Sequence, residues 1–277
     1  MNMTDYEAAR KTFRLQVPGD YEFTRDVVER WAAQHPGKLA LVAVGAHGGH
    51  RREISFGELA TASRRVANAL EALGATAGER AFVMLPRIPE WYELLLGMFR
   101  FGVIPMPATT LCTARDIAQR IERAGATIAV VDDEAAVKLA EVRDQCPSLR
   151  HVIVVGEPVE GGCERYGELI ARAGDVLPTG RVTKAGDPLL LYFTSGTVAA
   201  PKMVLHTHAS MGAGHEITAR FWQDLTPADL HWTFSDTGWA KAAWGKLFGQ
   251  WQIGCTVVAH DAAGKFDAKT HLELIGK

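Results

Sequence analysis

A run of hydroxyl side chains followed by a lysine is the part of this sequence best suited to chemistry. It reads YFTSGTVAAPK over residues 192–202, and it brings together Thr194, Ser195, Gly196, Thr197 and Lys202. The glycine lets backbone N–H groups come close to an oxyanion, and successive amides in such a turn form an anion-binding concavity. The segment therefore predicts a phosphate-binding loop directly after an apolar strand.

A Walker loop is the rival interpretation of this segment. That motif needs G-x-x-x-x-G-K-[ST]. Counted from Gly196, Pro201 takes the position of the second glycine and Met203 that of the magnesium-binding hydroxyl, so two defining positions fail. An ordinary polar turn is the other alternative for TSGT alone, and the flanking Tyr-Phe and Pro-Lys pairs argue against it.

A second segment, Ser235-Asp236-Thr237-Gly238-Trp239, lies between a predicted strand and a predicted helix. Ser235 or Asp236 could cap that helix, with Trp239 at its start. Core packing is the alternative for Trp239, because several tryptophans share this region, namely Trp232, Trp239, Trp244 and Trp251.

His206 and His208 could suggest a metal pair, because side chains at i and i+2 of a strand lie on one face. No third ligand recurs nearby in the sequence. Ordinary polar residues at a strand end are the favoured interpretation, and no metal site is predicted.

Composition restricts the class of protein. With 277 residues, 47% hydrophobic and 22% charged, the chain can bury a substantial core without disulfides. A formal charge of −2 provides no general attraction for nucleic acid, so none is expected as a partner. The four cysteines lie far apart, which argues against a zinc cluster and favours a reducing cytoplasm.

Targeting and membrane segments are not expected from the pattern. The first residues carry charges in place of the apolar centre of a signal peptide, and no apolar run approaches the length of a membrane span. Nothing in the pattern selects an oligomeric state.

The elements that position these residues alternate regularly, which predicts an α/β protein with parallel strands and helical crossovers. A hairpin is expected from strand 39–44 and an extended piece around Ile54. Further strands are expected at 81–85, 103–105, 127–131, 151–155, 188–193, 202–206, 230–234 and 255–258. Helices are expected at 24–35 with Thr24 as N-cap, 56–73, 89–101, 113–124, 134–145, 163–173, 209–222, 239–248 and 267–275.

The stretch 174–187 contains Pro178, Gly180 and Gly186 and is the best internal boundary. We expect a first α/β subdomain over 1–180 and the start of a second, with the loop, over 181–277. Because the sequence stops directly after a helix, an incomplete sheet with exposed apolar surface is predicted at the C-terminal end.

The loop YFTSGTVAAPK resembles the phosphate-binding signature of the adenylate-forming (AMP-binding) enzymes, Tyr/Phe-Thr-Ser-Gly-Thr-Thr/Ser-Gly-x-Pro-Lys. Val198 replaces a hydroxyl of that pattern and Ala199 its second glycine. A hydrogen bond from a hydroxyl to a charged group contributes about 1.5–3 kcal/mol, so the loss of this hydroxyl is expected to weaken ATP binding. Three more segments, at 17–32, 85–110 and 231–251, resemble those of medium-chain acyl-CoA synthetases in their usual order.

The resemblance implies stacked parallel-sheet subdomains with flanking helices, as in the large N-terminal domain of these enzymes, truncated. It implies activation of a fatty or aromatic carboxylate with ATP and Mg²⁺, followed by transfer to coenzyme A. Nucleotide contacts fall on Thr194, Ser195, Gly196, Thr197 and Lys202, with Thr194 and Lys202 catalytic.

For the acyl group, the resemblance implies a pocket beside Trp239 and His208. Several downstream motifs of the family and its C-terminal domain do not occur in this sequence. The expected function is therefore an acyl-CoA synthetase, impaired or inactive in this form. The alternative is a noncatalytic module that binds nucleotide or a partner.

Overall fold

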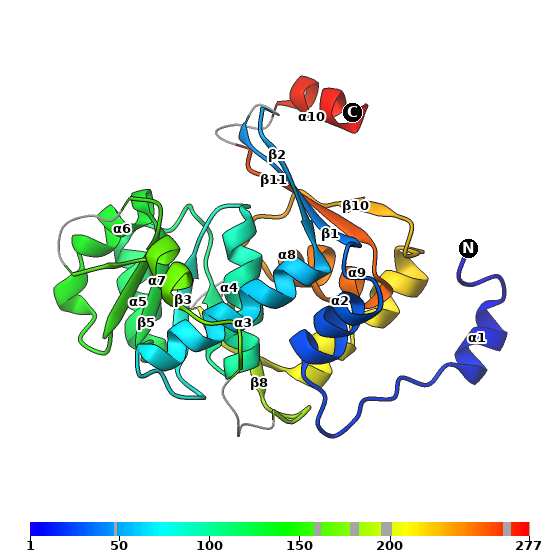
Figure 1. The fold of residues 1–277 in the computed structure, drawn as a ribbon, viewed down its shortest axis with the longest axis horizontal. Coiled ribbons are helices and arrows are strands. Elements are labelled where there is room, and N and C mark those ends of the chain that lie inside the picture. Colours follow the sequence, from blue (N-terminus) through cyan, green and yellow to red (C-terminus); the bar gives the residue numbers. More distant parts are fainter. Residues whose placement is uncertain (47–48, 158–161, 178–182, 195–200, 263–266, 277) are drawn as a thin grey trace.

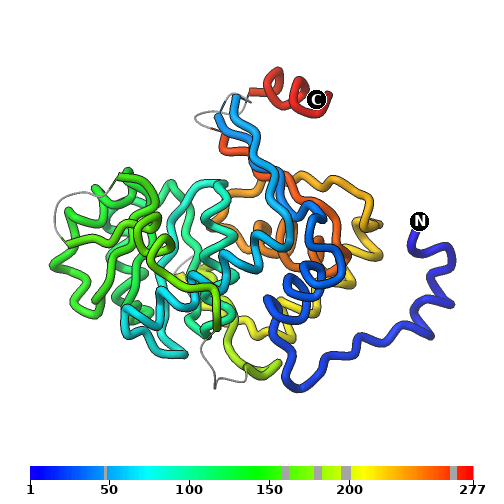
Figure 2. Tube along the Cα trace, in the orientation of Figure 1, coloured from blue at the N-terminus to red at the C-terminus, as the bar shows by residue number. Residues whose placement is uncertain are grey.

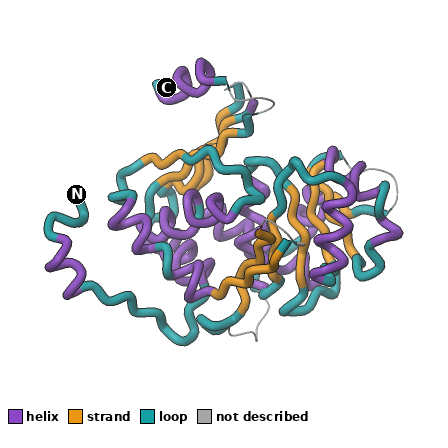
Figure 3. The backbone as a smooth tube through the Cα atoms, turned by 180° about the vertical axis from the view of Figure 1, so that it is seen from behind, coloured by secondary structure: helices purple, strands orange, loops and turns teal. Residues whose placement is uncertain are grey.

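Two sheets with a pair of long helices between them form the body of the protein (Figure 1). This computed structural model describes residues 1–46, 49–157, 162–177, 183–194, 201–262 and 267–276. Seen from behind in Figure 3, the strands of the two sheets form separate groups with helices between them. The predicted α/β class is confirmed.

The five-stranded sheet is parallel throughout, in the order β4-β3-β5-β6-β7. Its strands are β3 (Arg80–Met84), β4 (Ile104–Pro107), β5 (Ile128–Asp132), β6 (His151–Val155) and β7 (Glu164–Arg165). Alternate residues are buried on opposite faces: Val83 and Val130 face one core, and Phe82 and Val131 face the other. The connection from β3 leads to β4 on one side, and the next connection returns to β5 on the other side of β3. In open α/β sheets, ligands bind at the carboxyl ends of the strands where the strand order reverses in this way.

The first core lies against α3 (Phe56–Ala72) and α4 (Pro89–Phe101), and the second against α5 (Ala114–Ala124) and α6 (Asp133–Ala140). A capping box of Ser55 and Glu58 begins α3. Gly97 of α4 lies so close to α3 that a Cβ there would be 2.3 Å from Val66. The two helices therefore pack as one layer between the sheets.

The second sheet has four strands in the order β10-β11-β1-β2. They are β1 (Leu39–Val44), β2 (Arg51–Ser55), β10 (Leu230–Trp232) and β11 (Thr256–His260). Strand β1 pairs antiparallel with β2, as the expected hairpin requires, and parallel with β11. This sheet thus joins residues from both sides of position 180, and the division of the chain at 180 stays a prediction.

A separate two-stranded antiparallel sheet consists of β8 (Pro188–Thr194) and β9 (Lys202–Thr207), and β8 lies against β4. Residues 189–192 of β8 are buried, whereas β9 exposes Met203, Val204 and Leu205. The buried strand fixes where the loop that follows it begins.

The N-terminal segment is α1 (Tyr6–Thr12), then an extended stretch that runs along the outside of the body (Figure 2). The predicted helix 24–35 is present as a π-helical turn, Thr24–Glu29, followed by α2 (Arg30–Gln34). The assignment of Thr24 as its N-cap was wrong, because the Thr24 hydroxyl donates to the Leu96 carbonyl at 3.0 Å instead. Tertiary contact with α4 outweighs the local capping bond.

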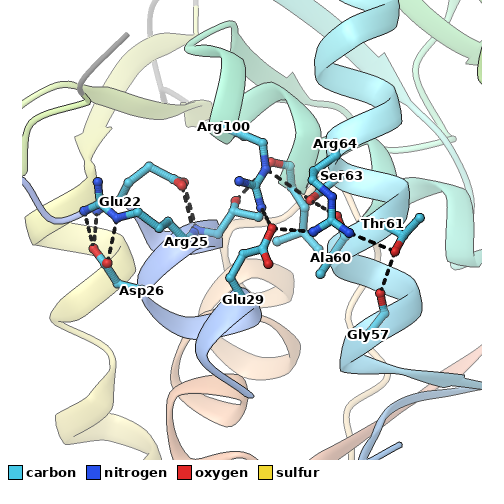
Figure 4. Close-up of polar contacts among 12 residues, drawn as sticks. Glu22, Arg25, Asp26, Glu29, Gly57, Ala60, Thr61, Ser63, Arg64 and Arg100 are labelled. Atoms are coloured by element: carbon cyan, nitrogen blue, oxygen red, sulfur yellow. Dashed lines mark hydrogen bonds and ion pairs between the residues drawn. The ribbon is translucent and has the colours of Figure 1, made fainter. Parts of the chain in front are cut away.

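A buried ion network fastens this segment to the two central helices (Figure 4). One carboxylate oxygen of Glu29 accepts from Arg64 of α3 at 2.7 Å and from Arg100 of α4 at 2.8 Å. Arg100 also donates to Ser63 at 3.2 Å. Burial raises the pKa of the nearby Glu22 carboxyl, against the opposing charge of Arg100. The network joins three elements that are distant in sequence.

Several predicted helices differ in the structure. Residues 164–165 pair as β7, so α7 is shorter than expected, Tyr166–Arg172. Helix α6 ends at Ala140, and a 3₁₀ turn follows at Arg143–Gln145. The predicted helix 209–222 consists of two π-helical turns, His208–Ala213 and Thr218–Trp222. The region after Trp239 forms α8 (Ala240–Lys246) and a second helix, α9 (Phe248–Ile253), that was not predicted.

The last helix, α10 (Ala268–Ile275), stands away from the body beside the four-stranded sheet (Figure 1). A cavity of about 420 Å³ lies between them, lined on the helix side by Leu274 and Ile275 and on the sheet side by Trp232 and Val258. Leu272 and Ile275 are 69% and 67% exposed. The predicted apolar surface at this end is therefore present.

Candidate functional site

The β8–β9 hairpin brings together the two ends of the predicted phosphate loop. Thr194 and Lys202 are Cα partners in the antiparallel register, and both side chains are exposed. The intervening Ser195, Gly196 and Thr197 lie outside the described residues. A hydroxyl and an ammonium group therefore lie at the two ends of the loop.

The turn Ser235–Trp239 lies against the carboxyl ends of β3 and β4. The Thr237 hydroxyl donates to the carbonyl of Leu85, which directly follows β3, at 2.5 Å. Gly238 touches the backbone that follows β4: a Cβ there would lie 1.9 Å from the Thr109 nitrogen and 2.2 Å from the Ala108 carbonyl carbon. The turn is therefore fixed at the edge of the sheet where ligands bind in open α/β folds.

Asp236 stabilises this turn from within. Its carboxylate accepts from the Gly238 N–H at 2.8 Å, two residues along the chain, and its carbonyl accepts from Trp239 at 3.2 Å. The expectation that Ser235 or Asp236 caps α8 was wrong, because Trp239 occupies the N-cap position without a side-chain bond. The aspartate forms a local turn in place of a helix cap.

The turn is also near the strand that carries the phosphate loop. Tyr192 of β8 is fully buried, and burial raises the pKa of its hydroxyl, with the negative charge of Asp236 adding to the increase. Tyr192 precedes Thr194 by two residues. The charge of Asp236 in the turn therefore acts on Tyr192 of the strand that leads to the loop, although the two segments are separate along the chain.

Trp239 and His208 are placed very differently. The Trp239 side chain is 60% exposed and follows the fixed turn, and its part in a substrate pocket stays a prediction. His208 is fully buried, accepts from the Phe23 N–H at 3.2 Å and lies with its ring 6.5 Å from that of Phe99. His208 thus packs beneath the N-terminal segment, and its part in a substrate pocket stays a prediction.

The other histidine of the pair, His206, is half-buried, and burial lowers the pKa of its imidazole. Within the ranges that the structure describes, no group of three or more His, Cys, Asp or Glu side chains is arranged to hold a metal ion. In the same ranges, every helix is too short or too polar to cross a lipid bilayer.

Sequence reasoning missed one residue beside the turn. Lys246, the last residue of α8, is fully buried and donates to the Ser235 carbonyl at 2.5 Å. Its pKa is lowered to about 7, mainly by burial and also by the charge of Arg87, while Asp236 acts in the opposite direction. A lysine within the otherwise apolar run AAWGKLF was the signal that could have identified it.

Comparison with known proteins identifies the family of the chain. The family model "AMP-binding enzyme" matches residues 28–277. The chain is 35% identical over 282 aligned residues to "Acyl-coenzyme A synthetase ACSM3, mitochondrial" of Homo sapiens, covering 100% of this chain and 48% of that protein. It is 34% identical to "Acyl-coenzyme A synthetase ACSM4, mitochondrial" of Rattus norvegicus, covering 99% and 48%.

Two solved structures match as well. The crystal structure of Brucella canis acyl-CoA synthetase has a TM-score of 0.87 at 25% identity, covering 99% of this chain and 50% of that one. The anthranilate CoA ligase AuaEII, solved with anthranoyl-AMP, has a TM-score of 0.80 at 24% identity, with 89% and 46% covered, which shows a shared fold. The chain thus spans about half the length of the relatives it matches. On the family match across most of its length, this chain belongs to the AMP-binding enzymes.

Proposed function

We propose that this chain forms the phosphate-binding and carboxylate-binding part of an acyl-CoA synthetase. In the proposed reaction a carboxylate oxygen attacks the α-phosphorus of ATP, which gives an acyl-adenylate and releases pyrophosphate. The thiolate of coenzyme A then attacks the acyl carbon and releases AMP. The acyl group is a medium-chain fatty acid or a small aromatic acid.

The observation that carries this proposal is the pairing of Thr194 with Lys202 on a hairpin whose strand β8 lies against β4, the strand whose end holds the turn. Such transfers depend mainly on positioning and on neutralising charge. Thr194, Ser195, Gly196 and Thr197 would donate to the β- and γ-phosphates, and Lys202 would stabilise the departing pyrophosphate. Trp239, exposed next to the fixed turn, would form one wall for the acyl group.

Mg²⁺ would supply charge neutralisation on the phosphates. Among the described residues no group of three or more His, Cys, Asp or Glu side chains is arranged to hold a metal ion, and we assign the ion no ligand in this chain. The four cysteines are free thiols. The cytoplasm predicted from their spacing stays a prediction, since the names of the relatives place those proteins in mitochondria.

Carboxylate-dependent ATP–pyrophosphate exchange on the purified 277-residue chain tests the proposal, with octanoate and benzoate as substrates. We expect low exchange that requires carboxylate and falls at least tenfold in Lys202→Ala and Thr194→Ala, because each change removes a bond to a charged phosphate. Lys184→Ala, an exposed lysine just before β8, is the matched control and should keep the exchange. Exchange that is equal with and without carboxylate would contradict adenylation.

The second function is that of a noncatalytic module, because Thr194 and Lys202 at the ends of the loop would serve nucleotide binding without transfer as well. The chain would then bind nucleotide without catalysing transfer. Calorimetric titration with ATP separates the two functions. Binding that is lost in Lys202→Ala, together with no exchange, supports the noncatalytic module.

A further inference from the structure

The ammonium group of Lys246, at the end of α8, lies inside the protein. The N-cap residue at the other end of this helix, Trp239, is exposed. The Lys246 side chain is fully buried, and its Nζ reaches back along α8 to the Ser235 carbonyl at 2.5 Å. Among the described residues, the Ser235 carbonyl accepts the hydrogen bond from the Lys246 ammonium group. A buried ammonium is costly, and an apolar side chain of similar length is often neutral or stabilising in its place.

The bond closes a loop that contains the whole turn. Lys246 fixes the start of the turn at Ser235, and Thr237 and Gly238 fix its middle against the ends of β3 and β4. Trp239 comes next in the chain and is 60% exposed. Without the Lys246 bond, the turn would keep its contacts with the five-stranded sheet and lose its connection to the end of α8.

Other charged groups surround the Lys246 ammonium. Arg87 lowers its pKa, and Arg87 itself donates to the carbonyls of His260 at 2.8 Å and Ala262 at 3.1 Å. Asp236 raises the pKa from within the turn. On the adjacent strand, the His231 ring bonds the Gly245 carbonyl at 2.8 Å, and burial lowers the pKa of that ring. Burial has the largest effect on Lys246, and it sets the pKa to about 7.

We propose that Lys246 is a positioning residue for the acyl-binding side of the site: its bond to the Ser235 carbonyl holds the turn that places Trp239. The proposal rests on the proposed function for the role of Trp239 and deepens it. An ammonium donor bonds a carbonyl more strongly than a neutral amine does. Loss of the proton weakens this donor and also removes a buried charge, so the position of Trp239 should change with the protonation state of Lys246.

Fluorine NMR of the chain labelled with 5-fluorotryptophan tests the positioning directly. The chain has seven tryptophans, and the Trp239 signal is assigned with Trp239→Phe. In Lys246→Met, which keeps the length and removes the donor, we expect the Trp239 signal to shift and sharpen while the signal of the buried Trp251 stays in place. Lys11→Met, an exposed change on α1, is the control and should leave both unchanged. An unmoved Trp239 signal, or equal shifts of Trp239 and Trp251, overturns the proposal.

A pH titration of the unmodified chain keeps the test independent of how the variant folds. We expect the Trp239 signal to move with a midpoint near pH 7, with no such movement for Trp251. A Trp239 signal that stays constant from pH 6 to pH 9 overturns the proposal.

Titration with octanoate in the presence of ATP separates this inference from the proposed function. If the unmodified chain gives no response of the Trp239 signal to carboxylate, the proposed function fails, whereas the ligand-free comparison above still decides the role of Lys246. With a response, Lys246→Met should raise the octanoate concentration for half-maximal change about tenfold, the effect of losing one bond from a charged donor. Equal concentrations in both proteins overturn the proposal.

Discussion

The hydroxyl of Thr237 donates to the carbonyl of Leu85, and this one bond joins the turn before α8 to the end of β3. Thr237 is 1% exposed, so its removal leaves a buried acceptor unsatisfied. We expect Thr237→Val, which keeps the shape, to lower the free energy of unfolding by about 1–3 kcal/mol. Urea denaturation measures this loss, and Thr237→Ser, which keeps the hydroxyl, should lose clearly less. Equal losses would show that the methyl group is what matters.

Gly238→Ala should displace the turn, because the new methyl group would lie within 2.2 Å of backbone atoms of Ala108 and Thr109. Backbone cannot yield as a flexible side chain can, so we expect a loss of stability of about 1–3 kcal/mol or more. Gly245→Ala on α8 is the matched control, since its Cβ would meet Thr233 at an ordinary 3.5 Å. Thermal unfolding of both variants checks this, and a neutral Gly238→Ala would mean that the turn lies further from β4.

Lys246 should make stability depend on pH above neutrality. Its pKa is about 7 in the folded protein against a usual 10.5, so between these values the unfolded chain binds one proton more. The free energy of unfolding of the unmodified protein, measured relative to Lys246→Met, should therefore rise by about 1.4 kcal/mol per pH unit in that window. Below pH 7 the difference should be constant. Urea denaturation at several pH values measures it, and parallel curves for the two proteins would contradict the lowered pKa.

Glu29→Ala should be destabilising, because it removes the carboxylate that accepts from Arg100, whose side chain is 8% exposed (Figure 4). Glu29 and Arg64, which loses the same acceptor, are 28% and 24% exposed, so we expect a loss of about 1–3 kcal/mol, less than for a fully buried pair. Glu53→Ala breaks the exposed pair with Arg51 and should cost at most about 1 kcal/mol. Chemical denaturation of the two variants makes the comparison, and similar losses would show that water compensates Arg100.

The α/β alternation could be predicted from the sequence because it depends on local periodicity. Short apolar runs such as 128–131, alternating with helices, are typical of central parallel strands, and the helices expected at 56–73 and 113–124 are present with capping boxes at Ser55 and Thr113. The loop after Phe193 could be recognised for the same reason, since its residue types and spacing lie within one short segment. The pairing of Thr194 with Lys202 follows from two adjacent strands and a turn.

Tertiary structure alone decided which distant residues meet. Nothing in the segment around Thr24 indicates that its hydroxyl bonds Leu96 in place of capping its own helix, and nothing around His208 indicates that Phe23 covers it. The turn at Asp236 meets the ends of β3 and β4 through Thr237 and Gly238, and the bond between Thr237 and Leu85 joins residues 152 positions apart in the chain. Hydrogen bonding and burial depend on the atoms that surround a group in space, whereas a sequence pattern reports only the neighbours along the chain.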